Sequence, residues 1–324
     1  MLVSVILPCY NSKDLIGIAI RSILDQTLQD FELIVVDDAS QDSSIDVIKS
    51  FMDPRIKLIQ LNVNGGYPVA MNAGIAHAEG KYIARMDADD ISAPTRLHEQ
   101  LKALERNPEA SFCGVARYRI TPGGKLYTDR KKFESLYVQE TWDNLMQGNR
   151  IFTDPSVMIA KEKIMAVGGY RTFQRSGMDV DLWLRVMEKY GPCVTITAPL
   201  FGKGLEPGSL IFNPTTNLIN QIPRVLARQR TDKGVDDVQA GQGVSIEAYK
   251  KQGWIKEGGM EERSGLFLGS LVTCLWLNDW RGAGIYYRQL RGTDMSLVRI
   301  IFMVLKKILQ RVRSNPFVRY KLPA

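Results

Sequence analysis

Residues 81–90 read KYIARMDADD, a short apolar run that ends in three acidic side chains. The aromatic and apolar residues at 82–86 predict a buried strand, and Pro94 marks the start of a helix shortly after it. Carboxylates crowded at the end of a strand repel one another unless a cation lies among them. Open α/β sheets bind ligands beyond the carboxyl ends of their strands, so the stretch predicts a metal and diphosphate site. The alternative is a solvated acidic turn that caps the next helix.

The chain before this stretch alternates apolar strands with helical patterns. Continuous apolar runs at 2–7, 31–36 and 56–61 predict three more buried strands. Four strands that alternate with helices predict an α/β sheet with parallel pairing through right-handed crossovers. Asp37 and Asp38 close the second strand, so two acidic strand ends are expected on the same edge of the sheet.

A glycine pair, Gly65-Gly66, follows the third strand and precedes a helix. It has the spacing of neither a P-loop nor a G-x-G-x-x-G motif, which favours a turn over a phosphate cradle. A kinase, an ATPase or an NAD-dependent enzyme is therefore not expected.

Shorter elements are expected in the middle of the chain. They are a helix at 94–106, a strand at 111–120, a hairpin turn at 121–124, a strand at 156–160 and a helix at 161–167. Residues 142–150 fit no clear pattern. Residues 177–186 read as a loop that enters an amphipathic helix, where Asp179 and Asp181 either favour the helix N-terminus or face a cleft.

The pattern changes after about residue 200. Residues 202–209 read as a loop, helical patterns resume at 217–230, and the polar residues at 231–245 predict a flexible connection. Beyond residue 261 the pattern is helical throughout.

Composition limits the class of protein. The 324 residues are 45% hydrophobic and 24% charged, as is ordinary for a globular protein. Four widely spaced cysteines and two histidines argue against a zinc site, a disulfide framework or a Ser-His triad, and they fit a reducing cytosol. The N-terminus has no pattern of a secretion signal, and the longest apolar runs are too short to span a membrane.

The net charge of +7 is unevenly distributed. Residues 281–324 hold ten Lys or Arg and one acid, Asp294, which gives +9 and leaves −2 for the remainder. On a helix over 297–313, five basic residues share one arc and apolar residues lie opposite. Such a helix can lie on an anionic bilayer, and the alternative is a core-packing helix with a solvated basic face. The tail has no nucleic-acid-binding motif.

Five segments within residues 1–200 occur in a characteristic order. They read VSVILPCYN at 3–11, ELIVVDDAS at 32–40, the run at 64–90, TDPSVM at 153–158 with GGYR at 168–171, and DVDLWLR at 179–185. Together they resemble the family 2 glycosyltransferases, which have the GT-A fold.

The resemblance implies a fold and a division of the chain. The implied fold is an α/β GT-A nucleotide-sugar-binding domain with a mostly parallel central sheet at 1–205, with a nucleotide-sugar half at about 1–110 and an acceptor half at about 111–205. Residues 206–324 are expected to form a mainly helical C-terminal region with the basic amphipathic tail.

The resemblance also implies roles for individual residues on the donor side. Asp38, helped by Asp37, is expected to contact a uracil or thymine base, and the main chain near Pro8 and Tyr10 borders the nucleoside. Ala88 is expected to contact the donor within the Asp-x-Asp motif.

The resemblance assigns metal binding and activation of the acceptor to three carboxylates. The resemblance implies that Asp87 and Asp89 hold Mg²⁺ or Mn²⁺, with Asp89 as the direct ligand, and that Asp179 is the general base. A metal stabilises the charge on a departing diphosphate, and a base activates a poorly nucleophilic hydroxyl. One base without a second nucleophilic carboxylate implies single displacement with inversion.

Three positions depart from the family pattern. Met178 stands where a Glu usually precedes the base, which puts the base assignment in doubt. Asp154 replaces a frequent His on the acceptor side, and Met71 replaces an Arg that is a candidate phosphate partner.

The expected function is an inverting glycosyltransferase that moves a sugar from a nucleoside-diphosphate sugar, a UDP-sugar first, to a hydroxyl of a saccharide acceptor. Family and tail together extend this to a lipid-linked acceptor in bacterial surface-polysaccharide synthesis, in the cytoplasm at the inner face of the membrane. The alternatives are a sugar-nucleotide nucleotidyltransferase, whose glycine-rich basic signature is missing near Pro8, and a non-catalytic nucleotide-sugar-binding protein, which Met178 would permit.

Overall fold

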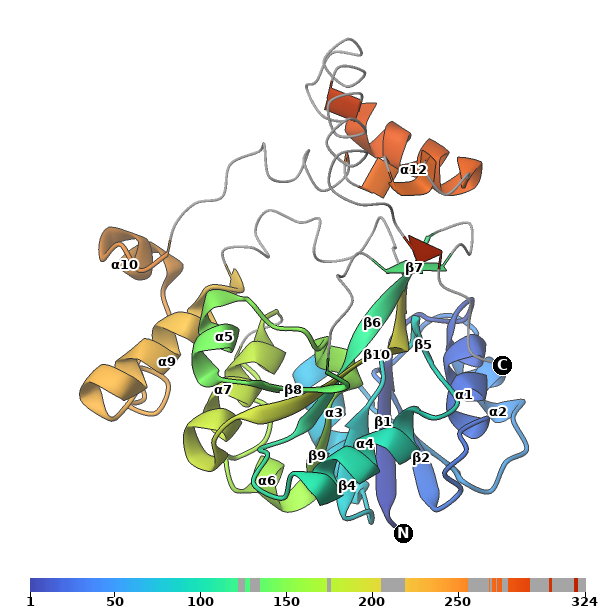
Figure 1. Cartoon of the computed structure of the whole chain (residues 1–324), viewed down its shortest axis with the longest axis horizontal. Coiled ribbons are helices and arrows are strands. Elements are labelled where there is room, and N and C mark those ends of the chain that lie inside the picture. Colours follow the sequence, from blue (N-terminus) through green and yellow to red (C-terminus); the bar gives the residue numbers. More distant parts are fainter. Residues whose placement is uncertain are drawn as a thin grey trace.

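The computed structural model describes residues 1–121, 126–128, 135–173, 176–204 and 219–255, and the shorter pieces 268, 270–271, 273–275, 279–291, 303–304 and 318–319. Its described strands join into one mixed sheet with helices on both faces (Figure 1). The α/β class expected from the alternating pattern is confirmed.

The N-terminal part of the sheet is parallel. Strand β1 (Val3–Cys9) lies between β2 (Phe31–Asp37) and β4 (Tyr82–Arg85), and β3 (Ile56–Gln60) pairs with β2 on the outside. Every residue of β1 and β2 is buried, because helices cover both faces. The carboxyl ends of β1, β2 and β4 therefore meet at one edge, as predicted.

Two hydrophobic layers hold the helices against this sheet. One face packs against α1 (Ile16–Leu24), α2 (Ser44–Lys49) and α4 (Arg96–Arg106). The other face packs against α3 (Tyr67–His77), α6 (Lys161–Met165) and α7 (Met178–Tyr190). Alternation along β1 explains the division, since Val5 joins the first cluster and Ile6 the second.

The second half of the sheet is mixed. It is built from β5 (Asp90–Ser92), β6 (Cys113–Ile120), β7 (Leu126–Thr128), β8 (Tyr137–Glu140), β9 (Met158–Ala160), β10 (Cys193–Gly204) and β11 (Val318–Arg319). Strand β9 joins it to β4 by antiparallel pairing, and β10 runs parallel to β6 and antiparallel to β5 and β8.

Strand β10 corrects one prediction. The loop expected at 202–209 is wrong for 202–204, which belong to this strand, while 205–209 lie outside the described residues. The register shifts on both sides of Pro199, so an irregularity accommodates a residue that cannot donate a ladder hydrogen bond. Pairing with β5 and β6 then extends the strand across its glycines, which the local sequence does not reveal.

Several short elements refine the other predictions. The unassigned stretch 142–150 contains α5 (Trp142–Gln147), which a capping box between Thr141 and Asn144 begins and left-handed Gly148 ends. The strand expected at 156–160 starts later, at Met158, because a 3₁₀ turn, η1 (Asp154–Ser156), comes first. The expected hairpin turn lies mostly outside the described residues.

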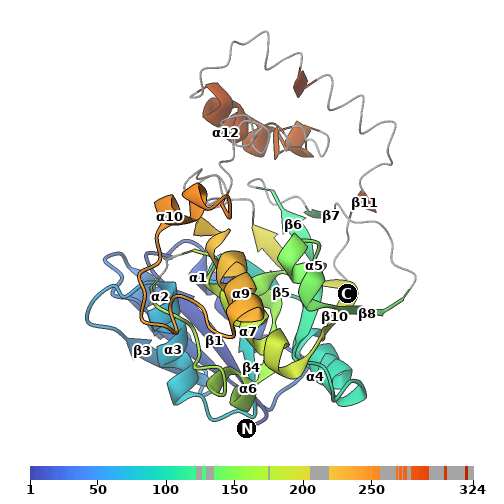
Figure 2. The ribbon, with the colours of Figure 1, turned by 90° about the vertical axis from the view of Figure 1, so that its left-hand side faces the viewer.

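The described C-terminal pieces are mainly helical, with α9 (Ile222–Lys233), α10 (Ile246–Lys251) and α12 (Trp280–Arg291). Helix α9 lies beside α7 (Figure 2). It continues to Lys233, so the flexible connection expected from residue 231 is wrong at its start. Of the expected basic helix at 297–313, the structure describes 303–304 as helical, and the five basic residues lie outside the described residues. Among the described helices, none combines the length and apolar character needed to cross a membrane.

Candidate active site

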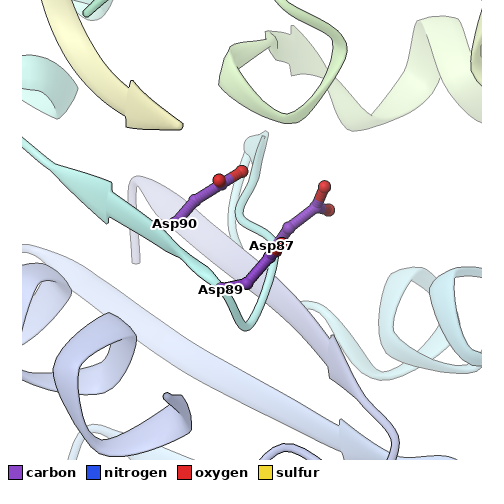
Figure 3. Close-up of side chains that lie close together, drawn as sticks. All are labelled: Asp87, Asp89 and Asp90. Atoms are coloured by element: carbon purple, nitrogen blue, oxygen red, sulfur yellow. The ribbon is translucent and has the colours of Figure 1, made fainter. Parts of the chain in front are cut away.

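Three carboxylates gather just beyond the carboxyl end of β4. Oxygen atoms of Asp87, Asp89 and Asp90 all lie within 4.8 Å of one another. Asp87 and Asp89 come from the tight segment that joins β4 to β5, and Asp90 is the first residue of β5 (Figure 3). Burial and the nearby Asp87 raise the pKa of Asp89, and burial with both neighbouring acids raises the pKa of Asp90 well above its usual value. The cluster thus holds more negative charge than its surroundings easily stabilise.

One lysine from β10 partly compensates this charge. Lys203 pairs with Asp90 across the β5–β10 register, and its Nζ lies 3.3 Å from Asp90 Oδ2 and 3.7 Å from Asp87 Oδ2. The carboxylates raise the pKa of the Lys203 ammonium against the opposing effect of burial. Asp90 is therefore neutralised by the chain itself, whereas Asp89 forms no ion pair with a described residue at this edge.

The remaining oxygen atoms fit a hard divalent cation. Asp90 Oδ1 is buried without a hydrogen-bond partner among the described residues, and Asp87 and Asp89 present further carboxylate oxygens a few ångströms away. Mg²⁺ and Mn²⁺ prefer oxygen donors and are commonly held by one or two carboxylates together with substrate phosphates.

A buried arginine links this cluster to helix α7. Arg85, the last residue of β4, is 1% exposed. Its Nη1 lies 2.9 Å from Asp179 Oδ1, and its Nη2 lies 3.5 Å from Asp87 Oδ1. Nη2 also donates a hydrogen bond to the hydroxyl of Tyr67, which in turn donates to Asp87 Oδ1 at 3.0 Å. One guanidinium thus joins the two predicted functional regions.

Asp179 occupies the second position of α7, where a helix N-terminus favours negative charge. Its side chain is 17% exposed. Burial, helped by Asp154 and Asp87 and opposed by Arg85 and Arg150, raises its pKa to about 7. A carboxylate in this range can hold or release a proton near neutral pH.

The neighbouring Asp181 has a different environment. It is fully buried, accepts a hydrogen bond from Arg185 Nε at 2.9 Å, and pairs with Arg171 at 3.3 Å. Arg171 continues to Asp236 at 2.8 Å, beyond the end of α9. Asp181 therefore belongs to a structural ion network that joins α7 to the segment after α9.

The loop ends of β2 and β3 form the other side of this edge. Each Asp38 oxygen accepts one backbone hydrogen bond, from Gly65 and Gly66, both at 2.8 Å. Gly66 has a φ of +83°, a conformation that favours glycine, and directly precedes Tyr67 and α3. The glycine pair, expected to form a turn, lies in an irregular loop whose amides bind Asp38 and which leads directly to Tyr67, the residue that contacts Asp87.

Comparison with known proteins identifies the family. Residues 4–176, more than half of the chain, match the family model described as glycosyl transferase family 2. The chain belongs to glycosyl transferase family 2.

Curated relatives of this family 2 chain carry glycosyltransferase names. It is 32% identical over 194 residues to "Putative glycosyltransferase EpsE" of Bacillus subtilis, covering 58% of this chain and 67% of that one. It is 34% identical over 193 residues to "Putative teichuronic acid biosynthesis glycosyltransferase TuaG" of the same organism, covering 58% and 73%. It is 37% identical over 119 residues to the Escherichia coli "UDP-Glc:alpha-D-GlcNAc-diphosphoundecaprenol beta-1,3-glucosyltransferase WfaP", covering 37% and 47%.

Solved structures confirm the GT-A-like fold. The S. aureus TarS 1-349 complex with UDP superposes with a TM-score of 0.56 at 15% identity, over 96% of this chain and 92% of TarS 1-349. The complex of the same fragment with UDP-GlcNAc gives 0.55 at 15% identity, over 89% and 92%.

The nucleoside-side residues of the family 2 pattern occupy different environments. Tyr10 is 44% exposed just past β1, and Pro8 pairs in register with Val36. Asp37 is buried and accepts hydrogen bonds from the Ser40 amide at 3.1 Å and from the Cys9 thiol at 3.6 Å. The structure gives Asp37 a local role in shaping the loop after β2.

The three departures from the family pattern also have defined surroundings. Met178 is 8% exposed in the apolar cluster behind α7, and Met71 is fully buried in the same cluster. Asp154 pairs with Arg150 and accepts a hydrogen bond from Trp183 Nε1 at 3.2 Å. Neither methionine supplies charge to the site, so Arg85 and Arg150 are the cations that act most strongly on Asp179.

The site residues predicted from the sequence do not include Arg85, Tyr67 or Lys203. Arg85 carried a detectable signal, because a charged residue inside an otherwise apolar strand must find a buried partner. Lys203 carried none, since its strand was expected to be a loop. Ala88 is buried between the acids, as a residue of small volume in a crowded turn must be.

Proposed function

We propose that this family 2 glycosyltransferase moves a sugar from a UDP-sugar to a hydroxyl of a saccharide acceptor, by single displacement with inversion. Asp179 acts as the general base. Asp87 and Asp89 hold Mg²⁺ or Mn²⁺, with Asp89 as the direct ligand. Asp38, with the main chain at Pro8 and Tyr10, borders the nucleoside.

One observation carries the proposal: a single buried guanidinium lies between Asp179 and the acidic cluster. A reaction that breaks the bond between sugar and diphosphate needs a group on one side that stabilises the negative charge of the diphosphate. It needs a base on the other side to accept the proton of the acceptor. Arg85 fixes these two carboxylate groups at opposite ends of one short link. The raised pKa of Asp179 supports a proton-accepting role near neutral pH.

The chemistry assigns each group one task. A bound divalent cation supplies Lewis-acid stabilisation of the charge on the departing diphosphate. Asp179 accepts the proton of the acceptor hydroxyl as that oxygen attacks the anomeric carbon. Asp181 is not proposed for this role, because arginines of the structural network engage its carboxylate.

The names of the relatives support particular classes of donor and acceptor. UDP or UDP-GlcNAc is bound in the two TarS complexes, and WfaP is named as a UDP-glucose-dependent enzyme that acts on a diphosphoundecaprenol-linked sugar. TuaG is named for teichuronic acid biosynthesis. These names support a UDP-sugar donor and a lipid-linked saccharide acceptor in surface-polysaccharide synthesis.

The charge of residues 281–324 supports a place at the cytoplasmic face of the membrane. Ten basic residues against one acid give this segment +9, which favours an anionic lipid surface. A lipid-linked acceptor is presented at such a surface.

A donor screen tests the function directly. We expect one or more UDP-sugars to raise the melting temperature in Mn²⁺ and GDP-sugars to leave it unchanged, because only a bound ligand stabilises the folded state. A dTDP-sugar in the same screen tests whether the site accepts thymine as well as uracil. UDP release with and without an acceptor then separates the alternatives. Acceptor-dependent UDP release supports transfer, consumption of UTP and sugar phosphate indicates a nucleotidyltransferase, and binding without any turnover indicates a non-catalytic protein.

A further inference from the structure

Arg85 is a charged side chain in a setting that fixes its position. It is 1% exposed, and its guanidinium carbon lies 5.1 Å from the ring centre of Tyr67 and 5.9 Å from those of Tyr170 and Trp183. Three aromatic rings stabilise the cation and leave it little freedom to move. The guanidinium stays charged in this setting, because nearby acids outweigh the cost of burial.

The contact with Asp179 is close but is not a directed hydrogen bond. Nη1 and Oδ1 are 2.9 Å apart, yet neither atom has a hydrogen-bond partner among the described residues. The pair is held by charge, and the lone pairs of Oδ1 are not committed to an N–H donor. Asp181 differs, since Arg185 Nε donates a directed bond to it at 2.9 Å.

The two terminal nitrogens of the guanidinium contact two different carboxylates. Nη1 faces Asp179, while Nη2 faces Asp87 and bonds to the Tyr67 hydroxyl. A lysine ammonium is a point charge on a flexible stem and cannot hold both directions together. The separation between Asp179 and the acidic cluster is thereby set by one rigid side chain.

We propose that Arg85 is a positioning residue for the transfer reaction, which holds Asp179 ionised and oriented opposite the acidic cluster while leaving its carboxylate free to accept a proton. This inference rests on the proposed function of Asp179. Arg85 does not touch the reacting atoms; it acts through Asp179 and Asp87.

The charged groups that face Asp179 make the effect of Arg85 testable. Arg85 comes from β4, Asp87 follows β4, and Asp154 and Arg150 lie in and before η1. The phenol of Tyr170, which is buried and has a pKa well above its usual value, also faces this cluster. Of the two cations, Arg85 has the stronger effect on Asp179, so its loss leaves mainly acids around the base.

The test compares Arg85→Lys and Arg85→Met with a matched control, Arg185→Lys. Arg185 is also a buried arginine that pairs with an aspartate of α7, but it contacts Asp181 and not Asp179. The readouts are the pH profile of kcat/KM, UDP affinity in Mn²⁺, the melting temperature, and the titration of the Asp179 carboxyl carbon by ¹³C NMR.

We expect the acidic limb of the profile to move upward by about one pH unit in Arg85→Lys, with kcat falling about tenfold at pH 7 while UDP affinity changes less. Arg85→Met, if folded, should show a larger change. Arg185→Lys should lower the melting temperature and leave the acidic limb in place. An unmoved acidic limb in both Arg85 variants, or a loss of stability without a kinetic change, would overturn the proposal.

The NMR titration separates this inference from the function on which it rests. If Asp179→Asn retains turnover but the Asp179 resonance titrates at higher pH in Arg85→Lys, the base assignment fails and the control of Asp179 by Arg85 stands. If Asp179→Asn is inactive and the resonance titrates identically in the wild type and in Arg85→Lys, the base assignment stands and the inference about Arg85 fails.

Discussion

Lys203 and Asp90 face each other across two antiparallel strands, with the ammonium 3.3 Å from the carboxylate. The strands are far apart in the sequence, and their pairing places a cation against the most deeply buried acid of the cluster. Asp90 is 1% exposed, and its carboxylate would otherwise be strongly destabilised. The Lys203–Asp90 ion pair therefore stabilises the fold, and Asp87 and Asp89 remain available to bind an added cation.

Replacing Lys203 should show how strongly the stability of the fold depends on its ion pair with Asp90. Lys203→Met leaves Asp90 buried without its cation, so we expect the free energy of unfolding to fall by about 3 kcal/mol, the lower end for breaking a buried pair, since Lys203 is partly exposed. Urea denaturation measures the change. Adding Asp90→Asn to Lys203→Met should recover most of the loss, whereas equal stability of the single and double variants would show that the pair is not coupled.

Asp179→Asn should abolish transfer and preserve donor binding. Loss of a positioned general base typically costs about 10²–10⁴-fold in rate, and the amide keeps the shape of the side chain. Acceptor-dependent UDP release and UDP affinity in Mn²⁺ are the two measurements. Asp181→Asn is the matched control, which should lower the melting temperature because Arg171 and Arg185 lose a buried partner. Near-normal turnover of Asp179→Asn would move the base assignment to Asp154, which also acts on this cluster.

Activity should depend on pH through the ionisation of Asp179. The base works only when deprotonated, and its pKa is raised to about 7, so kcat/KM should rise with pH below 7 and level off above it. An ordinary exposed aspartate would instead be ionised throughout this range. A profile that is flat between pH 5 and 8 would contradict the raised pKa.

Asp89→Ala should remove metal-dependent donor binding. Asp89 lies in the acidic cluster with no described cation paired to it, so its loss takes away a ligand without breaking an ion pair. The melting temperature with UDP and Mn²⁺ should no longer rise above that with UDP alone. The exposed Asp232 on α9 offers a control, since Asp232→Ala should behave as the wild type. Full activity of the wild type in excess EDTA would remove the metal from the mechanism.

The basic C-terminal segment should bind anionic membranes. Full-length protein should sediment with vesicles of anionic phospholipid, and a variant truncated near Asp294 should not. Residues 281–324 carry a net charge of +9, and most of their basic residues lie beyond Asp294. Added salt should weaken the binding through screening. Equal sedimentation of both proteins would show that the tail does not carry the membrane contact.

The sequence predicted most of the parallel half of the fold. The apolar runs at 2–7, 31–36 and 56–61 are strands because residues buried on both faces must be apolar throughout. The acids after β2 and β4 were expected to share one edge, and they do, because strands β1, β2 and β4 are parallel. Residues 177–186 were expected to be a loop that enters an amphipathic helix, and that helix begins at Met178 with Asp179 in its first turn.

The antiparallel half was harder to foresee. Strand β10 contains Pro199, Gly202 and Gly204, which are poor strand formers, and it owes its conformation to partners from three other strands. The position of Lys203 follows from that pairing. Nothing near Lys203 in the sequence indicates Asp90 as its neighbour.

By itself, the sequence determined which segments are buried, where the acids end their strands, and which family the chain resembles, because these depend on local periodicity and residue order. The tertiary structure alone decided which charges meet. Arg85 reaches Asp179 on α7 and Lys203 reaches Asp90 on β5 only after strands and helices distant in sequence have packed together. Electrostatic interactions depend on distance in space and on burial, and neither quantity is written in the order of the residues.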